Sequence, residues 1–232
     1  MNTEGVDIIR VARAVAAKDL RIELRSRVLT NQVVPFSLIV MVMFAFALDS
    51  DVVLERVAPG LVWLATLFSV LIIVQRSFAV ETADGALDQL RASGVPAAGV
   101  FLGKAAALVS QLLVLVAVLV LAAVVLYRAE IDPEGALLLI ATSVAATSGL
   151  AAMATLYGGL SSGAKGRETL LPLLLLPVVA PVLIGATRAT EAAFGTNGVA
   201  TSDGWPWLGL LAVFAVLFSV VGAVAFGPLL DE

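Results

Sequence analysis

The chain has 232 residues, of which 60% are hydrophobic and only 14% are charged, and its formal net charge is −4. Soluble domains carry about 25% charged residues, so this composition excludes an ordinary water-soluble fold. The sequence has no Cys and no His, which excludes disulfides, thiolate nucleophiles, Cys/His metal sites and a histidine ligand for haem iron.

Residues 1–27 are polar and lack the short apolar core of a cleaved signal peptide. Within them, residues 8–18 form an amphipathic pattern at helical spacing, with basic side chains opposite apolar ones. We expect a cytoplasmic interfacial segment that lies flat on an anionic membrane surface, or a basic tail that only fixes topology. Asp19 and Glu23 would fall on the apolar side of a continuous helix, so we predict a bend near them.

Six runs without Asp, Glu, Lys or Arg follow, each of about 18 residues or more. At 1.5 Å per residue, such a helix crosses or nearly crosses a hydrocarbon core of about 30 Å. Backbone N–H and C=O groups inside a bilayer find no water, so they must form hydrogen bonds within the protein, as they do in a helix. The runs are too long for the strands of a β-barrel. We predict an all-α integral membrane protein with a single membrane domain over residues 1–232. The six predicted spans are residues 28–48, 57–74, 105–126, 135–160, 170–187 and 207–230.

The distribution of Lys and Arg predicts the orientation of these spans. With the N-terminus in the cytoplasm, the cytoplasmic segments hold 11 of the 14 basic residues, and the external segments hold only Arg56, Arg128 and Arg188. Trp205 and Trp207 lie at the beginning of the last span, where an aromatic belt is typical. We expect a multi-pass protein of a bacterial or archaeal inner membrane, with both termini cytoplasmic.

The external connections at residues 49–56 and 127–134 are too short for a folded domain. The third, residues 188–206, has room for a turn or a short interfacial helix. In the fourth span, Ala145 and Gly149 have the small-residue spacing that lets helices approach closely.

The fifth predicted span contains Pro172, Pro177 and Pro181. Proline removes a backbone donor and clashes with the preceding turn, so we expect this helix to be kinked or partly broken. The kink could form a flexible gate that lines a cavity, or it could serve packing alone.

The uncharged spans argue against an enzyme and against an ion-coupled carrier. A self-contained enzyme needs positioned titratable groups, and ion-coupled carriers usually hold charged groups inside the membrane. The phosphate-binding pattern G-x-x-x-x-G-K-[ST] is also absent from the sequence. We expect a non-catalytic subunit without a cofactor of its own, and any ATP must be bound by a partner.

The segment between the second and third spans, residues 76–91, predicts a partner. On a helix, its three acidic side chains form a narrow stripe opposite an apolar ridge. An acidic stripe would be repelled by an anionic membrane surface, but it suits a basic groove on another protein. A solvated loop is the alternative. The candidate docking residues are Glu81, Asp84, Gly85, Leu87, Asp88 and Leu90.

The run APGLVWLATLFSVLIIVQRSFAVETADGALDQL at residues 58–90, followed by Pro96 and Lys104, resembles the cytochrome c maturation protein B (haem exporter B) family. In that family an Ala-Pro-Gly…Trp span leads into an acidic Asp-Gly-x-Leu-Glu-Gln-Leu-type cytoplasmic segment. The sequence departs at Ala86, where Ser or Thr is common, and at Asp88, where Glu is common. Neither departure changes the charge of the acidic stripe.

The resemblance extends to LRIELR at residues 20–25 and to LLPLLLLPVVAPVLIGAT at residues 170–187, so it covers nearly the whole chain. It implies a membrane subunit of an ABC-type complex with the helices of a type-2 permease. The implied partners are an ABC ATPase subunit, a haem-handling membrane protein, a periplasmic haem chaperone and a second copy of the chain, all in the lipid bilayer or beside it. Nucleic acid is not expected among them.

The resemblance also implies that ATP hydrolysis by the partner drives release of the haem-loaded chaperone. Haem would then be a cargo held mainly by partners, since only Met41, Met43 and Met153 remain as weak candidates to touch the iron. Two alternatives stay open: a type-2 ABC exporter permease for a lipid, polysaccharide or drug, and an ATP-independent membrane scaffold or channel. An ion-coupled carrier is disfavoured by the uncharged spans.

Overall fold

The computed structural model describes residues 3–48, 50–83, 94–129, 131–162 and 171–231. These residues form helices, and no strand occurs among them, as the sequence predicted. The long helices are α1 (Thr3–Ser26), α2 (Val34–Ala47), α3 (Asp51–Ala83), α5 (Ala97–Tyr127), α6 (Pro133–Ser162), α7 (Leu171–Ala193) and α8 (Trp205–Asp231).

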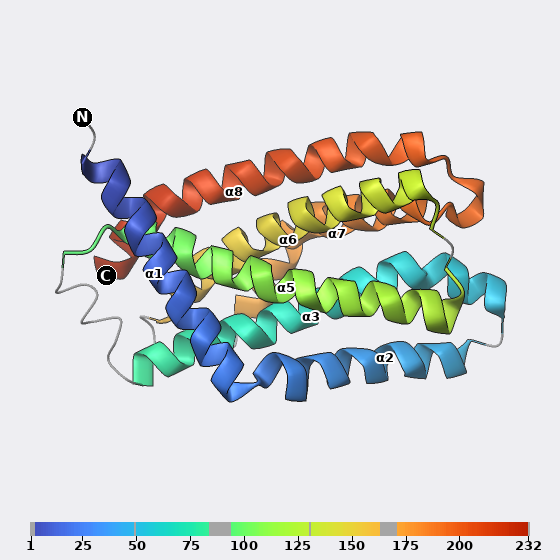
Figure 1. The fold of residues 1–232 in the computed structure, drawn as a ribbon, viewed down its shortest axis with the longest axis horizontal. Coiled ribbons are helices and arrows are strands. Elements are labelled where there is room, and N and C mark those ends of the chain that lie inside the picture. The colour runs from blue at the N-terminus through green and yellow to red at the C-terminus, as the bar shows by residue number, and fades with distance from the viewer. Residues whose placement is uncertain (1–2, 49, 84–93, 130, 163–170, 232) are drawn as a thin grey trace.

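Helices α2 to α8 run back and forth along the long axis of a bundle (Figure 1). Helix α1 crosses over α5 at one end, where the beginning of α1 and the end of α8 both lie. The connections from α2 to α3, from α5 to α6 and from α7 to α8 lie at the opposite end. This up-and-down course is the one that six consecutive spans require.

In the described part of the chain, five helical segments are long and apolar enough to cross a membrane. They overlap five of the six predicted spans and confirm a membrane-type architecture. The sixth predicted span, residues 170–187, coincides with the helix α7, but α7 is not one of these five segments, so its crossing stays a prediction. The five segments are Leu29–Ala47, Asp51–Ala79, Ala97–Tyr127, Pro133–Leu160 and Thr201–Pro228.

Helix α6 lies at the centre of the bundle, in contact with α3, α5, α7 and α8. Its residue Gly149 faces α8, where an added Cβ would lie 3.0 Å from a ring carbon of Phe214 and 3.6 Å from the backbone of Ala215. The close approach expected at Gly149 is therefore confirmed. The outer face of α8 exposes valines such as Val213 and Val224, as a lipid-facing helix does.

Hydrogen bonds tie the helices together inside this apolar bundle. The Tyr127 hydroxyl donates to the carbonyl oxygen of Met41 at 2.6 Å, which joins α5 to α2. The hydroxyl oxygens of Ser37 and Ser69 lie 3.0 Å apart and join α2 to α3. Such bonds fix helix register where the apolar surfaces alone do not.

Helix α1 continues through Asp19 and Glu23 to Ser26, so the predicted bend near the two acids is wrong. The chain turns instead at Arg27, whose φ of 52° is left-handed. A carboxylate oxygen of Glu23 accepts a hydrogen bond from the backbone N–H of Leu29 at 2.6 Å. This bond gives a partner to the backbone N–H of the first residue of the π-helix Leu29–Val33, which leads into α2.

Helix α7 runs from Leu171 to Ala193 through Pro177 and Pro181 without interruption. Of the two outcomes expected at these prolines, the partial break is therefore wrong, and the kink stays a prediction. After α7, two short 3-10 helices, Thr196–Gly198 and Thr201–Gly204, precede α8. They confirm the short structured connection expected within residues 188–206.

Candidate functional site

The apolar side of α1 packs on the first turns of α5. An ideal Cβ on Gly103 would lie 2.6 Å from the carbonyl oxygen of Ala12 and 2.7 Å from the Cβ of Val15. This contact leaves no room for any side chain at Gly103 and seats α1 directly on the backbone of α5. The apolar side that we expected to face the membrane surface therefore faces α5 over this stretch.

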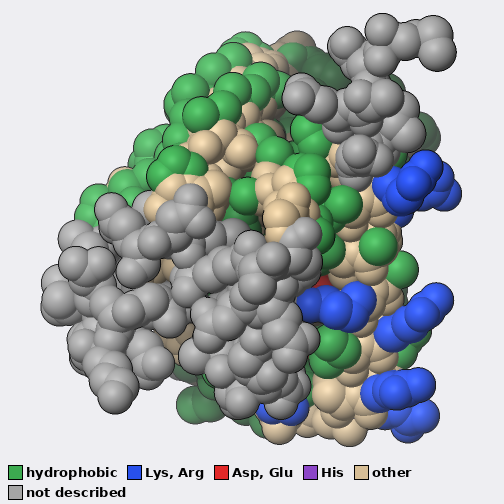
Figure 2. Space-filling view, turned by 90° about the vertical axis from the view of Figure 1, so that its left-hand side faces the viewer, with side chains coloured by type: hydrophobic (Ala, Val, Ile, Leu, Met, Phe, Trp, Pro, Cys, Tyr) green, Lys and Arg blue, Asp and Glu red, His purple; other side chains and the backbone are tan. Residues whose placement is uncertain are grey.

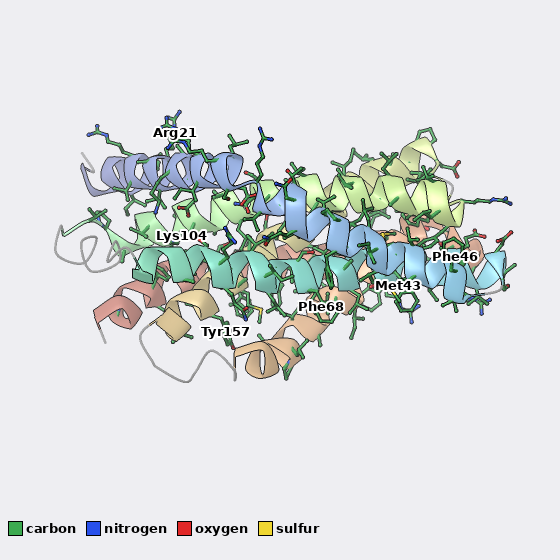
Figure 3. The ribbon with its side chains drawn as sticks, turned by 90° about the horizontal axis from the view of Figure 1, so that it is seen from below. Arg21, Met43, Phe46, Phe68, Lys104 and Tyr157 are labelled. Carbon is green, nitrogen blue, oxygen red and sulfur yellow. The ribbon has the colours of Figure 1, made fainter. Side chains whose placement is uncertain are left out.

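The opposite side of α1 is basic and exposed. Figure 2 shows Lys and Arg side chains gathered along one margin of the end of the bundle where the chain begins. In Figure 3 the labelled Arg21 points away from the bundle, whereas Lys104 lies between α1 and α3. The exposed basic residues of α1 are Arg10, Arg13, Arg21 and Arg25.

Lys104 is the centre of a buried polar cluster formed by α1, α3 and α5. Its ammonium lies 3.4 Å from a carboxylate oxygen of Asp19 and 3.4 Å from the hydroxyl of Ser77. It also lies 4.7 Å from the centre of the Phe78 ring, a favourable cation–π position. We call Asp19, Ser77, Phe78 and Lys104 the Lys104 junction.

The Lys104 junction extends to α6 through the Phe78 ring. An ideal Cβ on Gly158 would lie 2.5 Å and 2.6 Å from two carbons of this ring, so a glycine is required for the ring to fit. One aromatic side chain of α3 thus touches the backbone of α6 and the ammonium of α5. A movement of α3 at Phe78 would therefore disturb its contacts with α6 and α5. It would also reach α1 through the ion pair between Lys104 and Asp19.

The predicted docking segment begins shortly after the junction. Glu81 lies in the last turn of α3, which ends at Ala83, five residues beyond Phe78. The first part of the segment is therefore helical and continues α3. The remaining candidate docking residues, Asp84, Gly85, Leu87, Asp88 and Leu90, lie outside the described residues. Their docking role stays a prediction.

A cavity of about 100 Å³ lies beside the junction, between α1, α3, α5 and α6. Its charged lining comes from Asp19, Glu23, Arg76 and Lys104. Gln111 also lines it; its side chain is buried, and its Oε1 has no hydrogen-bond partner among the described residues. A buried carbonyl oxygen without a donor is costly, so Gln111 is a weak point in the packing of α5.

Sequence reasoning missed both the pairing of Lys104 and the position of Gln111. The sequence contains only a weak indication that these two residues lie in a polar cluster. Gln111 is the one amide in the apolar run at residues 105–126, and Lys104 stands at the edge of that run beside Gly103. Neither pattern identifies Asp19 or Ser77 as neighbours, because both contacts join distant parts of the chain.

The prolines of the predicted gate do not line this cavity. Pro177 and Pro181 are exposed on the outside of α7, and nothing is described of the Pro172 side chain. A gating role for the three prolines stays a prediction.

The methionines that sequence reasoning considered for iron do not converge on one site. Met41 is fully buried, whereas Met43, two residues later on α2, is 65% exposed on its outer face (Figure 3). Met153 is buried in α6. Among the described residues, no cluster of three or more acidic side chains is placed to hold a metal ion.

The Ala-Pro-Gly…Trp motif joins α3 to α7. The indole N–H of Trp63 donates to the hydroxyl of Thr190 at 2.8 Å, and both side chains are buried. Ala58 and Pro59 of the motif are buried as well. These residues therefore have a packing role in the bundle, at a distance from the Lys104 junction.

Comparison with known proteins gives consistent results. The family model described as CcmB protein matches residues 10–231. Heme exporter protein B of Haemophilus influenzae is 31% identical over 218 residues, which cover 92% of each chain. Heme exporter protein B of Rhodobacter capsulatus is 34% identical over 187 residues, which cover 79% of this chain and 84% of the relative. The protein of the same name from Paracoccus denitrificans is 27% identical over 217 residues, which cover 92% and 94%.

Proposed function

This chain belongs to the CcmB protein family, and we propose that it is a membrane subunit of a haem-export complex that serves c-type cytochrome biogenesis. Its relatives carry the name heme exporter protein B, and the five long apolar helices in its described part suit a membrane component. The chain itself is not catalytic in this proposal. ATP hydrolysis in a partner subunit supplies the energy that releases the haem-loaded chaperone.

The continuity of α3 is the observation that carries the coupling part of the proposal. This helix runs unbroken from Asp51 to Ala83, through the second predicted span and the Lys104 junction, and ends inside the acidic segment. A push on the segment therefore moves α3 as a rod. Phe78 and Lys104 pass the movement to α6, α5 and, through Asp19, to α1.

The ATPase subunit docks on the acidic segment from the cytoplasm in this account. Glu81, Asp84 and Asp88 face basic groups of the ATPase, while Leu87 and Leu90 enter an apolar groove beside them. The orientation rests on the concentration of 11 of 14 basic residues on the side of the N-terminus, so the protein lies in the inner membrane with both ends cytoplasmic. Two copies of the chain would pair with two ATPase subunits.

Haem is held mainly by the partners. The chain offers no His or Cys, and two of the three candidate methionines are buried in the core of the bundle. A haem-handling membrane protein would ligate the iron, and the periplasmic chaperone would receive the haem. This subunit transmits the force that separates them.

Co-purification of the ATPase tests the docking proposal. The triple variant Glu81→Lys/Asp84→Lys/Asp88→Lys should lose the ATPase and remain in the membrane. A matched control, Asp132→Lys/Glu134→Lys/Asp203→Lys, reverses the charge of three acids at the opposite end of the bundle. This control should keep the ATPase. Full retention of the ATPase by the first variant would rule out docking on this segment.

Haem attachment to c-type cytochromes in a deletion strain tests the cargo. We expect the strain to lose covalent haem attachment and the wild-type gene to restore it. Normal haem attachment without this protein would instead favour export of another substrate. Restoration by the wild type but not by the acidic-segment variant would connect docking with haem handling.

A further inference from the structure

The outward side of α1 is a patch of unpaired positive charge. Its exposed basic residues are spaced by three, four or eleven positions, so they share one side of the helix. None of them forms an ion pair with a described residue, so their charges are free to meet a negatively charged partner. We call these residues the arginine face: Arg10, Arg13, Arg21 and Arg25.

The acids of α1 whose side chains are described are turned toward the bundle. Asp19 faces the ammonium of Lys104 at 3.4 Å, and Glu23 accepts a hydrogen bond from the backbone N–H of Leu29 at 2.6 Å. Neither carboxylate neutralises the arginine face. An anionic surface that approaches this side of α1 therefore meets charge of the opposite sign only.

The arginine face points sideways from the bundle. Figure 2 looks along the long axis of the bundle, and its Lys and Arg side chains gather along one margin. In Figure 3, Arg21 likewise points away from the bundle. Helix α1 rests on Gly99 and Gly103 of α5, just before the predicted span that begins at residue 105. The arginines therefore project into the layer where lipid headgroups surround the beginning of that span.

Two exposed aliphatic side chains accompany the arginines. Ile9 is 63% exposed and Leu24 is 76% exposed, and they lie toward opposite ends of α1. The boundary between headgroups and acyl chains accommodates both arginine and aliphatic side chains on one helix. This combination favours a lipid bilayer over an acidic protein of the cytosol as the partner of the arginine face.

We propose that the arginine face binds the phosphates of anionic phospholipids in the leaflet on the side of the N-terminus. The guanidinium groups donate to phosphate oxygens, while Ile9 and Leu24 enter the uppermost part of the acyl chains. Helix α1 is then held on one side by α5 and on the other by lipid. The amphipathic pattern alone suggests the reverse orientation, with the apolar side on the membrane. The site does not depend on the ATPase or on haem.

Lipid binding to the purified full chain tests the proposal through charge. Native mass spectrometry would compare phosphatidylglycerol, which is anionic, with phosphatidylcholine of the same acyl composition, which has no net charge. One arginine near an anionic lipid contributes about a fivefold preference, so the wild type should bind phosphatidylglycerol at least about fivefold more tightly. Equal binding of the two lipids would overturn the proposal.

Variants of the arginine face place the site. Replacement of all four residues by Gln should remove the preference, whereas replacement by Lys, which keeps the charge, should retain most of it. The control replaces three arginines of the opposite end that already have polar partners, and it should bind as the wild type does. Its changes are Arg56→Gln/Arg128→Gln/Arg188→Gln. An unchanged preference in the Gln variant would overturn the assignment, and so would its loss in the Lys variant.

The depth of α1 distinguishes a lipid surface from a protein partner. The chain has no native Cys, so a spin label can be attached at Ala17→Cys, an exposed position of α1 between Arg13 and Arg21. In vesicles of phosphatidylglycerol and phosphatidylcholine, this label should lie at the level of the phosphates. A matched label at Val216→Cys, on the exposed side of α8, should lie deeper among the acyl chains. A label at position 17 surrounded by bulk water would overturn the proposal and favour an acidic protein as the partner.

Discussion

The ammonium of Lys104 lies 3.4 Å from the Oδ2 of Asp19, although the two residues are 85 positions apart in the sequence. The side chain of Lys104 is 3% exposed and that of Asp19 is 10% exposed, so the pair is shielded from water. It fastens α1 to α5 at the place where α3 approaches its end. In our account, this pair makes α1 part of the moving bundle.

We expect Asp19→Asn to destabilise the protein by about 3–5 kcal/mol, because it removes the carboxylate that faces the buried ammonium of Lys104. Lys104→Met should cost less, because Asp19 keeps Lys18, whose ammonium lies 3.1 Å from its other carboxylate oxygen. The double variant should recover much of the loss, because neither charge then remains. Unfolding in detergent mixtures would measure all four proteins. A double variant that loses the sum of the two single effects would contradict a direct interaction.

The contact between α1 and α5 predicts opposite effects for two glycine substitutions. Gly103→Ala places a methyl group within 2.7 Å of two α1 atoms and should loosen α1, whereas Gly209→Ala meets nothing within 4 Å. The second change should be neutral or stabilise α8 by up to about 1 kcal/mol through helix propensity. The chain has no native Cys, so thiol labelling of an Ala12→Cys reporter measures the loosening. Equal labelling rates in both backgrounds would contradict the close packing.

The hydrogen bond from Trp63 to Thr190 predicts a thermodynamic coupling between α3 and α7. Trp63→Phe and Thr190→Val each remove the bond, so their effects on the free energy of unfolding should be less than additive. The coupling energy should be about 0.5–2 kcal/mol, as for other hydrogen bonds between membrane helices. A double-mutant cycle gives this value directly, and a coupling near zero would show that the bond contributes nothing.

Much of the fold could be predicted from the sequence because the apolar runs dominate it. Five of the six predicted spans match long apolar helices, and the small residue Gly149 lies at a close helix contact as expected. The local sequence is enough to predict these helices, because a membrane span requires an uninterrupted apolar run of about 20 residues.

The errors arose where a distant residue decides the local structure. The bend expected near Asp19 assumed that an acid on the apolar side of a helix must leave it. Lys104 supplies the counter-charge from another helix, so α1 continues, and the turn is made at Arg27 instead. A helix in a membrane tolerates interior prolines, so α7 continues through Pro177 and Pro181 without the expected break.

The candidate site was predicted only in part. The acidic stripe is visible in the sequence, but the Lys104 junction before it is not, since it brings together three helices that are distant along the chain. The unpartnered oxygen of Gln111 could only be seen with the packing around it.

The sidedness of the acidic segment gives a further prediction. A single cysteine at Asp88→Cys should resist a membrane-impermeant thiol reagent in cells whose inner membrane is intact, and it should react after that membrane is opened. A cysteine at Ser202→Cys, in the connection before α8, should react in both cases. Labelling of position 88 from the outside would invert the topology and place the segment out of reach of any ATPase.

Site-specific photo-crosslinking tests the central claim most directly, that the acidic segment after α3 contacts an ATPase. A photoreactive amino acid in place of Asp88 would be activated in living cells, with the same residue in place of Arg128, at the other end of α5, as the control. Our account predicts an adduct with the ATPase subunit from position 88 and none from position 128. The absence of that adduct from position 88, while the complex still assembles, would contradict it.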